Sequence, residues 1–155
     1  MTVTAMDAAL TAALLQPCLA AGSYVSYAGI INVVYFDAAS GRVFDLNAGF
    51  NTVLGETEPL TIPGIDPATL AAGDLKAFGS KPSGRTALVP GFFAGVAAAH
   101  ERFGKRPFAD VMAPAIRCAE QGFTLTPSLA GIMKSREAVL TRLPEARAIF
   151  TKPDG

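Results

Sequence analysis

The stretch TALVPGFFAGVAAAHERFGKRPFADVMAPAIRCAEQG, residues 86–122, decides the fold because every local signal within it agrees. Residues 87–89 predict a short buried strand, and an alanine-rich helix then spans residues 92–103. Pro107 suits the first turn of a second helix, which Gly122 ends. The apolar residues of this second helix recur every three or four positions and predict one buried face: Phe108, Val111, Met112, Ala115, Ile116 and Ala119.

A β-hairpin is predicted before this stretch. Residues 30–36, IINVVYF, are rich in β-branched and aromatic side chains and indicate a central strand. Residues 42–46 follow a short turn-forming segment and are predicted to pair with it. A hairpin among helices predicts the α+β class, with an antiparallel sheet.

Helices are also predicted at both ends of the chain. Residues 6–16 are apolar nearly all round and indicate a buried helix, which either Thr4 or Asp7 could cap. Near the other end, Thr126 caps a predicted helix whose apolar stripe runs to Leu140, and a shorter helix covers residues 144–150. Between the predicted hairpin and residue 86, we expect a short helix starting at Asp66 and a loop over residues 80–84.

Composition restricts the function. The 155 residues are 50% hydrophobic and 17% charged, which predicts one folded domain over residues 1–155 and excludes a disordered chain. Thirteen basic residues balance thirteen acidic ones, so nothing favours nucleic acid or an anionic membrane as a partner. A mean hydropathy of +0.35 is high for a free-standing domain, and we expect the surplus apolar surface to meet another protein segment.

Several short motifs, in their order and spacing, resemble the N-terminal part of the large subunit of the γ-glutamyltranspeptidase family of N-terminal-nucleophile (Ntn) hydrolases. They are Val89-Pro90-Gly91, AAHERFG at residues 98–104, Pro107, Ala113-Pro114-Ala115-Ile116, Ala119-Glu120 and Gly122-Phe123. The resemblance implies a four-layer αββα sandwich of Ntn-hydrolase type, completed by a partner subunit.

The chain itself offers no catalytic constellation. It holds no paired nucleophile and base, no metal-ligand spacing and no cofactor loop, and we expect the lone His100 to be solvent-facing or structurally bonded. The resemblance implies that the nucleophile is the N-terminal Thr of a small partner subunit, released by autoproteolysis, with its own amino group as base. The expected partners are that subunit and a small-molecule substrate, without cofactor, metal, nucleic acid or membrane.

Asn47 is the candidate substrate-binding residue. Family members end the hairpin strand with Asp-Phe-Arg-Glu, and the resemblance implies that the Arg pairs with the α-carboxylate of a γ-glutamyl group. This chain has Asp45-Leu46-Asn47-Ala48 instead. A neutral carboxamide cannot replace the two charge-assisted hydrogen bonds of a guanidinium. The alternative interpretation is that Asn47 merely ends the strand, as Asn does at turns.

The loop before the hairpin also departs from the family. Residues 22–32 keep only Gly22 and Gly29 where relatives carry a glycine-rich run, so the backbone there must take another shape. Together with Asn47, this favours a hydrolase for a non-γ-glutamyl substrate, through amide or C–C bond hydrolysis in specialised-metabolite biosynthesis. Ordinary γ-glutamyl transfer or glutathione hydrolysis, and a non-catalytic scaffold or binding protein, are the alternatives.

Localisation is expected to be cytoplasmic. A helical pattern follows Met1 at once, without the basic and apolar regions of an export signal. Cys18 and Cys118 lie in apolar contexts and are explained as reduced core residues.

Overall fold

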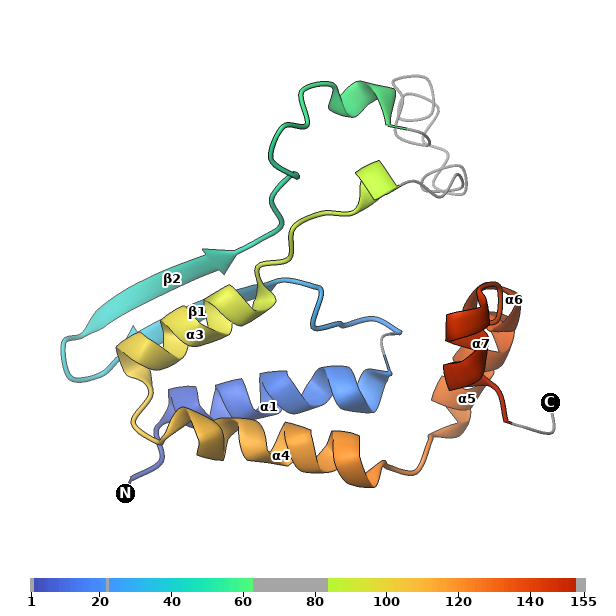
Figure 1. Cartoon of the computed structure of the whole chain (residues 1–155). Helices are drawn as coiled ribbons and strands as arrows, with labels where there is room; N and C mark the ends of the chain where they lie inside the picture. Colours follow the sequence, from blue (N-terminus) through green and yellow to red (C-terminus); the bar gives the residue numbers. More distant parts are fainter. Residues whose placement is uncertain (1, 22, 63–83, 153–155) are drawn as a thin grey trace. The chain divides into compact units, whose positions relative to one another are not determined.

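The computed structural model describes residues 2–21, 23–62 and 84–152, which form two compact units, Met1–Ser26 with Gly104–Gly155, and Tyr27–Phe103 (Figure 1). Helices and one antiparallel hairpin make up the described part, as the predicted α+β class requires. The short helix expected at Asp66, and all of the expected loop except Gly84, lie outside the described residues. The single domain expected over residues 1–155 stays a prediction.

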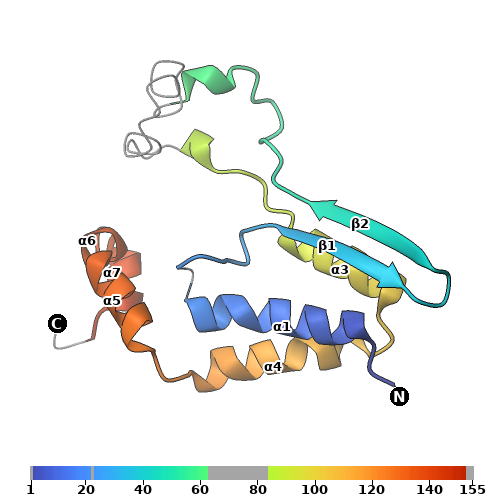
Figure 2. The same ribbon diagram turned by 180° about the vertical axis from the view of Figure 1, so that it is seen from behind.

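The first unit is built on two helices, α1 (Ala5–Ala20) and α4 (Phe108–Gln121), which lie side by side and run in the same direction (Figures 1 and 2). One stripe of α1 and two residues of α4 are buried: Met6, Leu10, Leu14, Val111 and Ala115. The bounds predicted for α4 are confirmed, and Gly122 ends it with φ 73°. The end predicted for α1 at Gln16 is wrong, because the helix continues through Pro17. The proline costs one backbone hydrogen bond, but its ring is buried.

Thr4 and Asp7 fix the start of α1 together. The Thr4 hydroxyl accepts from the Asp7 N–H at 3.1 Å, and the Asp7 carboxylate accepts from the Thr4 N–H at 2.9 Å, which makes a capping box. Only 2% of Asp7 is exposed. Its carboxylate also accepts from the backbone N–H groups of Lys105 at 3.0 Å and Arg106 at 3.3 Å. Burial raises the pKa of Asp7, but these hydrogen bonds outweigh it and lower the pKa from 3.8 to about 2.

The C-terminal helices are α5 (Pro127–Ser135), α6 (Glu137–Leu140) and α7 (Pro144–Phe150). Thr126 caps α5 as predicted, accepting from the Leu129 N–H at 3.2 Å. The prediction of one helix reaching Leu140 is wrong. The chain breaks at Arg136, whose N–H is shared between the carbonyls of Ile132 and Met133.

The second unit holds the predicted hairpin, β1 (Ile31–Asp37) and β2 (Arg42–Ala48), covered on one face by α3 (Phe92–Phe103). Phe103 packs on Tyr35 and Phe44, with ring centroids 4.4 and 5.1 Å apart. The other face carries large apolar side chains that remain exposed: Val34 (77%), Phe36 (61%) and Val43 (65%). The two short 3-10 helices are η1 (Pro59–Thr61) and η2 (Gly84–Thr86).

The buried strand predicted over residues 87–89 is wrong. Only Val89 pairs, in an isolated bridge with Asn51, where Val89 donates at 2.8 Å and Asn51 donates at 3.1 Å. Leu88 and Val89 are 47% and 45% exposed. Three apolar residues in a row are consistent with a buried strand, but they do not specify a partner strand on either side.

Candidate functional site

Two glycines, Gly91 just before α3 and Gly95 within it, bring the start of this helix against the end of β2. A Cβ atom on Gly91 would collide with the carbonyl oxygen of Ala48 and lie 2.6 Å from that of Gly49. On Gly95 it would collide with Ile31 and lie 2.5 Å from the Cβ of Ala48. Because only glycine permits this approach, the start of the helix fixes the backbone that directly follows Asn47.

Asn47 is the second-last residue of β2, and it lies on the exposed face of the hairpin. Its Oδ1 accepts the N–H of Gly49 at 3.0 Å, the side-chain turn that asparagine commonly forms at the end of a strand. The bond uses the carboxamide oxygen, so the NH₂ group is the donor that this side chain can offer to a ligand. The hydrogen bond is consistent with a structural role at the strand end, and a role toward substrate stays a prediction.

Asn32 is a site residue that the sequence interpretation did not single out. In the hairpin register it stands directly opposite Asn47, and both side chains are exposed. Side chains in such a cross-strand pair lie about 5 Å apart at their Cβ atoms. The sequence predicts the hairpin, but the register that pairs Asn32 with Asn47 comes from the structure, in which Asp37 joins β1 and pairs with Arg42.

A groove of about 540 Å³ runs beside Asn47, between the end of β2 and the first turns of α3. Its walls are the strand end, residues 49–51 and the glycine and alanine side of the helix. The polar side chains within it are the amides of Asn47 and Asn51. The groove can therefore offer neutral donors and acceptors to a ligand.

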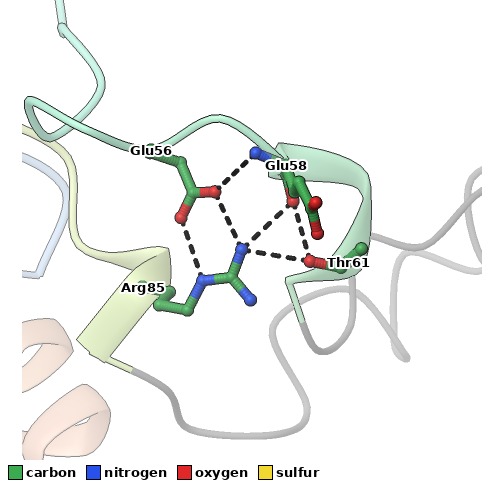
Figure 3. A network of polar contacts seen from close by, with 4 residues as sticks. All are labelled: Glu56, Glu58, Thr61 and Arg85. Atoms are coloured by element: carbon green, nitrogen blue, oxygen red, sulfur yellow. Dashed lines mark hydrogen bonds and ion pairs between the residues drawn. The ribbon is translucent and has the colours of Figure 1, made fainter.

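Arg85 carries a positive charge, but its guanidinium is already bound by Glu56, Glu58 and Thr61 (Figure 3). The Nε and Nη2 atoms of Arg85 donate to the two carboxylate oxygens of Glu56 at 2.9 and 2.8 Å. Nη2 also donates to the Glu58 carbonyl and the Thr61 hydroxyl, both at 3.1 Å. The hydrogen bond to Arg85 lowers the pKa of Glu56, and the same bond raises the pKa of Arg85.

The other arginines described in this unit stack on aromatic rings. Arg42 pairs with Asp37 in the register at the far end of the hairpin from Asn47, and its guanidinium lies 5.2 Å from the Phe44 centroid. Arg102 lies 4.6 Å from the Phe44 ring and 5.4 Å from Phe103. Within residues 27–62 and 84–103, every guanidinium thus has a carboxylate or aromatic partner. His100 is half-buried in the last turn of α3 and also has an interaction partner.

Among the described residues, no three His, Cys, Asp or Glu side chains converge in a way that could hold a metal ion. None of the helices described is both long and apolar enough to cross a bilayer.

Solved structures define the fold class. The γ-glutamyltranspeptidase of Helicobacter pylori superposes on 98% of this chain with a TM-score of 0.77 and 20% identity. The Bacillus anthracis transpeptidase enzyme CapD superposes on 99% with a TM-score of 0.67 and 18% identity. This chain spans 41% and 42% of those two chains. The fold is that of the γ-glutamyltranspeptidases.

The sequence comparisons then give the family. The family model described as Gamma-glutamyltranspeptidase matches residues 34–155. The chain therefore belongs to the γ-glutamyltranspeptidase family of Ntn hydrolases, which confirms the resemblance seen in its motifs.

Individual relatives match shorter segments. The chain is 37% identical over 81 residues to Scoloptoxin SSD14 of Scolopendra dehaani, which covers 52% of this chain and 14% of that protein. It is 40% identical over 66 residues to the Acylase ACY 1 proenzyme of Pseudomonas sp. (strain V22), covering 43% and 12%. It is 33% identical over 64 residues to Glutathione hydrolase 3 of Arabidopsis thaliana, covering 41% and 10%.

Proposed function

We propose that this chain is the N-terminal part of the large subunit of a heterodimeric Ntn hydrolase whose substrate lacks the γ-glutamyl carboxylate. The observation that carries the proposal is Asn47, a neutral residue at the strand end where the family pattern has arginine. Arg85 does not compensate, because Glu56 already holds its guanidinium in a bidentate pair.

The chemistry would come from the partner chain. Its N-terminal Thr hydroxyl attacks the substrate carbonyl while its α-amino group accepts the proton, and the acyl-enzyme is then released to water or to an acceptor. The chain described here contributes binding and orientation. Its exposed residues Val34, Phe36 and Val43 supply an apolar face on which the partner's sheet would pack to complete the four-layer sandwich.

The substrate class follows from the groups that face the site. Hydrogen bonds to charged groups contribute about 1.5–3 kcal/mol, so loss of a bidentate arginine costs a carboxylate substrate a factor on the order of a hundred in binding. Asn32 and Asn47 present two carboxamides instead, which suit a neutral acyl group with amide, hydroxyl or ketone oxygens. Cleavage of an amide or of a C–C bond beside a ketone is compatible with attack by the same Thr.

Two relatives support different substrates. The Pseudomonas protein is named an acylase, in line with a non-γ-glutamyl acyl group. The Arabidopsis protein is named a glutathione hydrolase and favours the alternative, ordinary γ-glutamyl chemistry. We further propose a reducing, cytoplasmic setting, in which Cys18 and Cys118 would remain thiols.

The test is to purify the protein that contains this chain and compare substrates. We expect slow turnover of γ-glutamyl-p-nitroanilide and faster turnover of a neutral acyl-p-nitroanilide such as phenylacetyl. N-terminal sequencing of a copurifying chain should return Thr as its first residue. Rapid γ-glutamyl turnover would support the alternative substrate, and a partner without N-terminal Thr would support a non-catalytic scaffold.

A further inference from the structure

The two cysteines occupy equivalent places on the parallel helices α1 and α4. Each lies in the last turn, and each carbonyl accepts the N–H that closes its helix: Cys18 from Ala21 at 3.1 Å, and Cys118 from Gly122 at 2.9 Å. Because the helices run side by side in the same direction, their last turns meet (Figure 2). Residues 100 positions apart in the sequence are thus brought together at one end of the pair.

The Cys18 side chain contacts α4 directly. The Cys18 Sγ lies 3.6 Å from the carbonyl oxygen of Ala115, one turn before Cys118. Burial raises the pKa of the Cys118 thiol, and the Cys18 thiol beside it raises that pKa further. Neither cysteine is in a disulfide and both are only half-buried, so a small oxidant can reach them.

Each helix contains a proline close to its cysteine, Pro17 in α1 and Pro114 in α4. A proline inside a helix removes one backbone hydrogen bond and loosens the turn around it. Each helix therefore lacks one backbone hydrogen bond near its cysteine. A disulfide requires the two Cα atoms to lie about 4.4–6.8 Å apart. The axes of most packed helices lie further apart than this, so the two cysteine backbones must approach each other more closely than the helix axes do.

We propose that Cys18 and Cys118 are an oxidative modification site, a dithiol pair that forms a reversible disulfide between α1 and α4. With hydrogen peroxide as the oxidant, one thiolate attacks peroxide and becomes a sulfenic acid with release of hydroxide. The second thiolate displaces the sulfenic oxygen, so that two thiols and one peroxide give one disulfide and two waters. A thiol reductant reverses the reaction by exchange.

The disulfide closes a loop of about 100 residues, a length at which crosslinking restricts the unfolded chain strongly. It also ties the C-terminal ends of the two helices, while Asp7 and the Lys105 N–H already tie their N-terminal ends. Oxidation is therefore expected to raise the midpoint of thermal unfolding by about 5 °C or more.

The test uses the purified full protein with its partner chain. It is treated with a small excess of hydrogen peroxide, the remaining thiols are blocked, and non-reducing peptide mapping is carried out by mass spectrometry. We expect a linked peptide pair containing Cys18 and Cys118, lighter by two hydrogen atoms than the sum of the thiol peptides. Dithiothreitol should separate the pair, and the oxidised protein should unfold at the higher temperature.

The matched variants are Cys18→Ser, Cys118→Ser and the double replacement. Serine is nearly isosteric with cysteine, so all three should fold, and none should gain stability on peroxide treatment. The proposal is overturned if the wild type gives only sulfinic or sulfonic acids at the two positions, or only disulfides between molecules. It is also overturned if the oxidised wild type and the oxidised double variant show the same shift in unfolding temperature.

Discussion

The carboxylate of Asp7 accepts a hydrogen bond at 3.0 Å from the backbone N–H of Lys105, which lies 98 residues further along the chain. The same carboxylate caps α1 through Thr4. The buried Asp7 side chain therefore fixes the start of α1, and it also holds α1 against the segment that leads into α4.

Replacing Asp7 by Asn should destabilise the folded protein by about 2 kcal/mol. A neutral amide cannot accept hydrogen bonds from the N–H groups of Thr4, Lys105 and Arg106 as well as a charged carboxylate does. The free energy of unfolding is measured by urea titration of the purified protein. Asp110→Asn is the matched control. Asp110 pairs with Arg106 at 2.7 Å on the surface, and that pair should contribute under about 1 kcal/mol. Equal losses in the two variants would contradict the role given to Asp7.

The pH dependence follows from the same group. The folded pKa of Asp7 is lowered to about 2 from 3.8, so its contribution to stability is fully present above the unfolded value. That contribution is lost as pH falls from about 5 to about 2, where the carboxylate is protonated in the folded state. The wild type should therefore lose more stability than Asp7→Asn when the two are compared between pH 6 and pH 3. Parallel curves for the two proteins would exclude Asp7 as the titrating group.

Replacing Asn47 by Arg should raise kcat/KM for γ-glutamyl-p-nitroanilide, by up to about a hundredfold where the guanidinium reaches the carboxylate. The control is Asn47→Ala, which removes the carboxamide without adding charge. It should leave γ-glutamyl turnover low and weaken the binding of a neutral acyl substrate. Robust γ-glutamyl turnover by the wild type, unchanged in Asn47→Ala, would show that the carboxylate is bound elsewhere.

Two Gly→Ala replacements inside helices should have opposite effects. In α3, Gly95→Ala places its methyl group against Ile31 and Ala48, and the overpacking should cost about 1–3 kcal/mol. In α5, Gly131→Ala meets no atom within 4 Å, so the better helix propensity of alanine should stabilise by up to about 1 kcal/mol. Thermal unfolding of the two variants checks the signs, and a stabilised Gly95→Ala protein would refute the close approach of α3 to β2.

The chain expressed without its partner should aggregate or lose fixed tertiary packing. Val34, Phe36 and Val43 are exposed on one face of a two-stranded hairpin, and such hairpins are marginal without further cover. Near-UV circular dichroism and dye binding measure the loss of packing. A sharp, cooperative thermal transition of the isolated 155-residue chain would contradict this expectation.

The sequence predicts the elements better than their packing. Helices α3 and α4 and the hairpin follow from local periodicity, Pro107 and Gly122, and they are found where expected. The extension of α1 through Pro17 was missed because burial of the ring offsets the proline's helix-breaking tendency, and burial depends on tertiary structure. The bridge between Val89 and Asn51 depends on a partner 38 residues earlier, which no local pattern reveals.

The site shows the same division. Asn47 stands out only because a family pattern has arginine there, since an asparagine at a strand end is otherwise unremarkable to sequence reasoning. The placement of Asn32 opposite it follows once the hairpin register is fixed. The ion pair between Arg85 and Glu56 could not be predicted from the sequence. The two residues are 29 positions apart, and no regular helix or strand sets their distance.

The pairing of α1 with α4 has a consequence for folding during synthesis. The apolar stripe of α1 is finished early, but the helix that covers it follows only after the whole segment 27–103 has been made. At about 5–20 residues per second, translation of that segment leaves Met6, Leu10 and Leu14 uncovered for roughly 4–15 s. The nascent chain therefore carries an unprotected hydrophobic helix on the ribosome, which makes this helix the expected point of contact for a cotranslational chaperone.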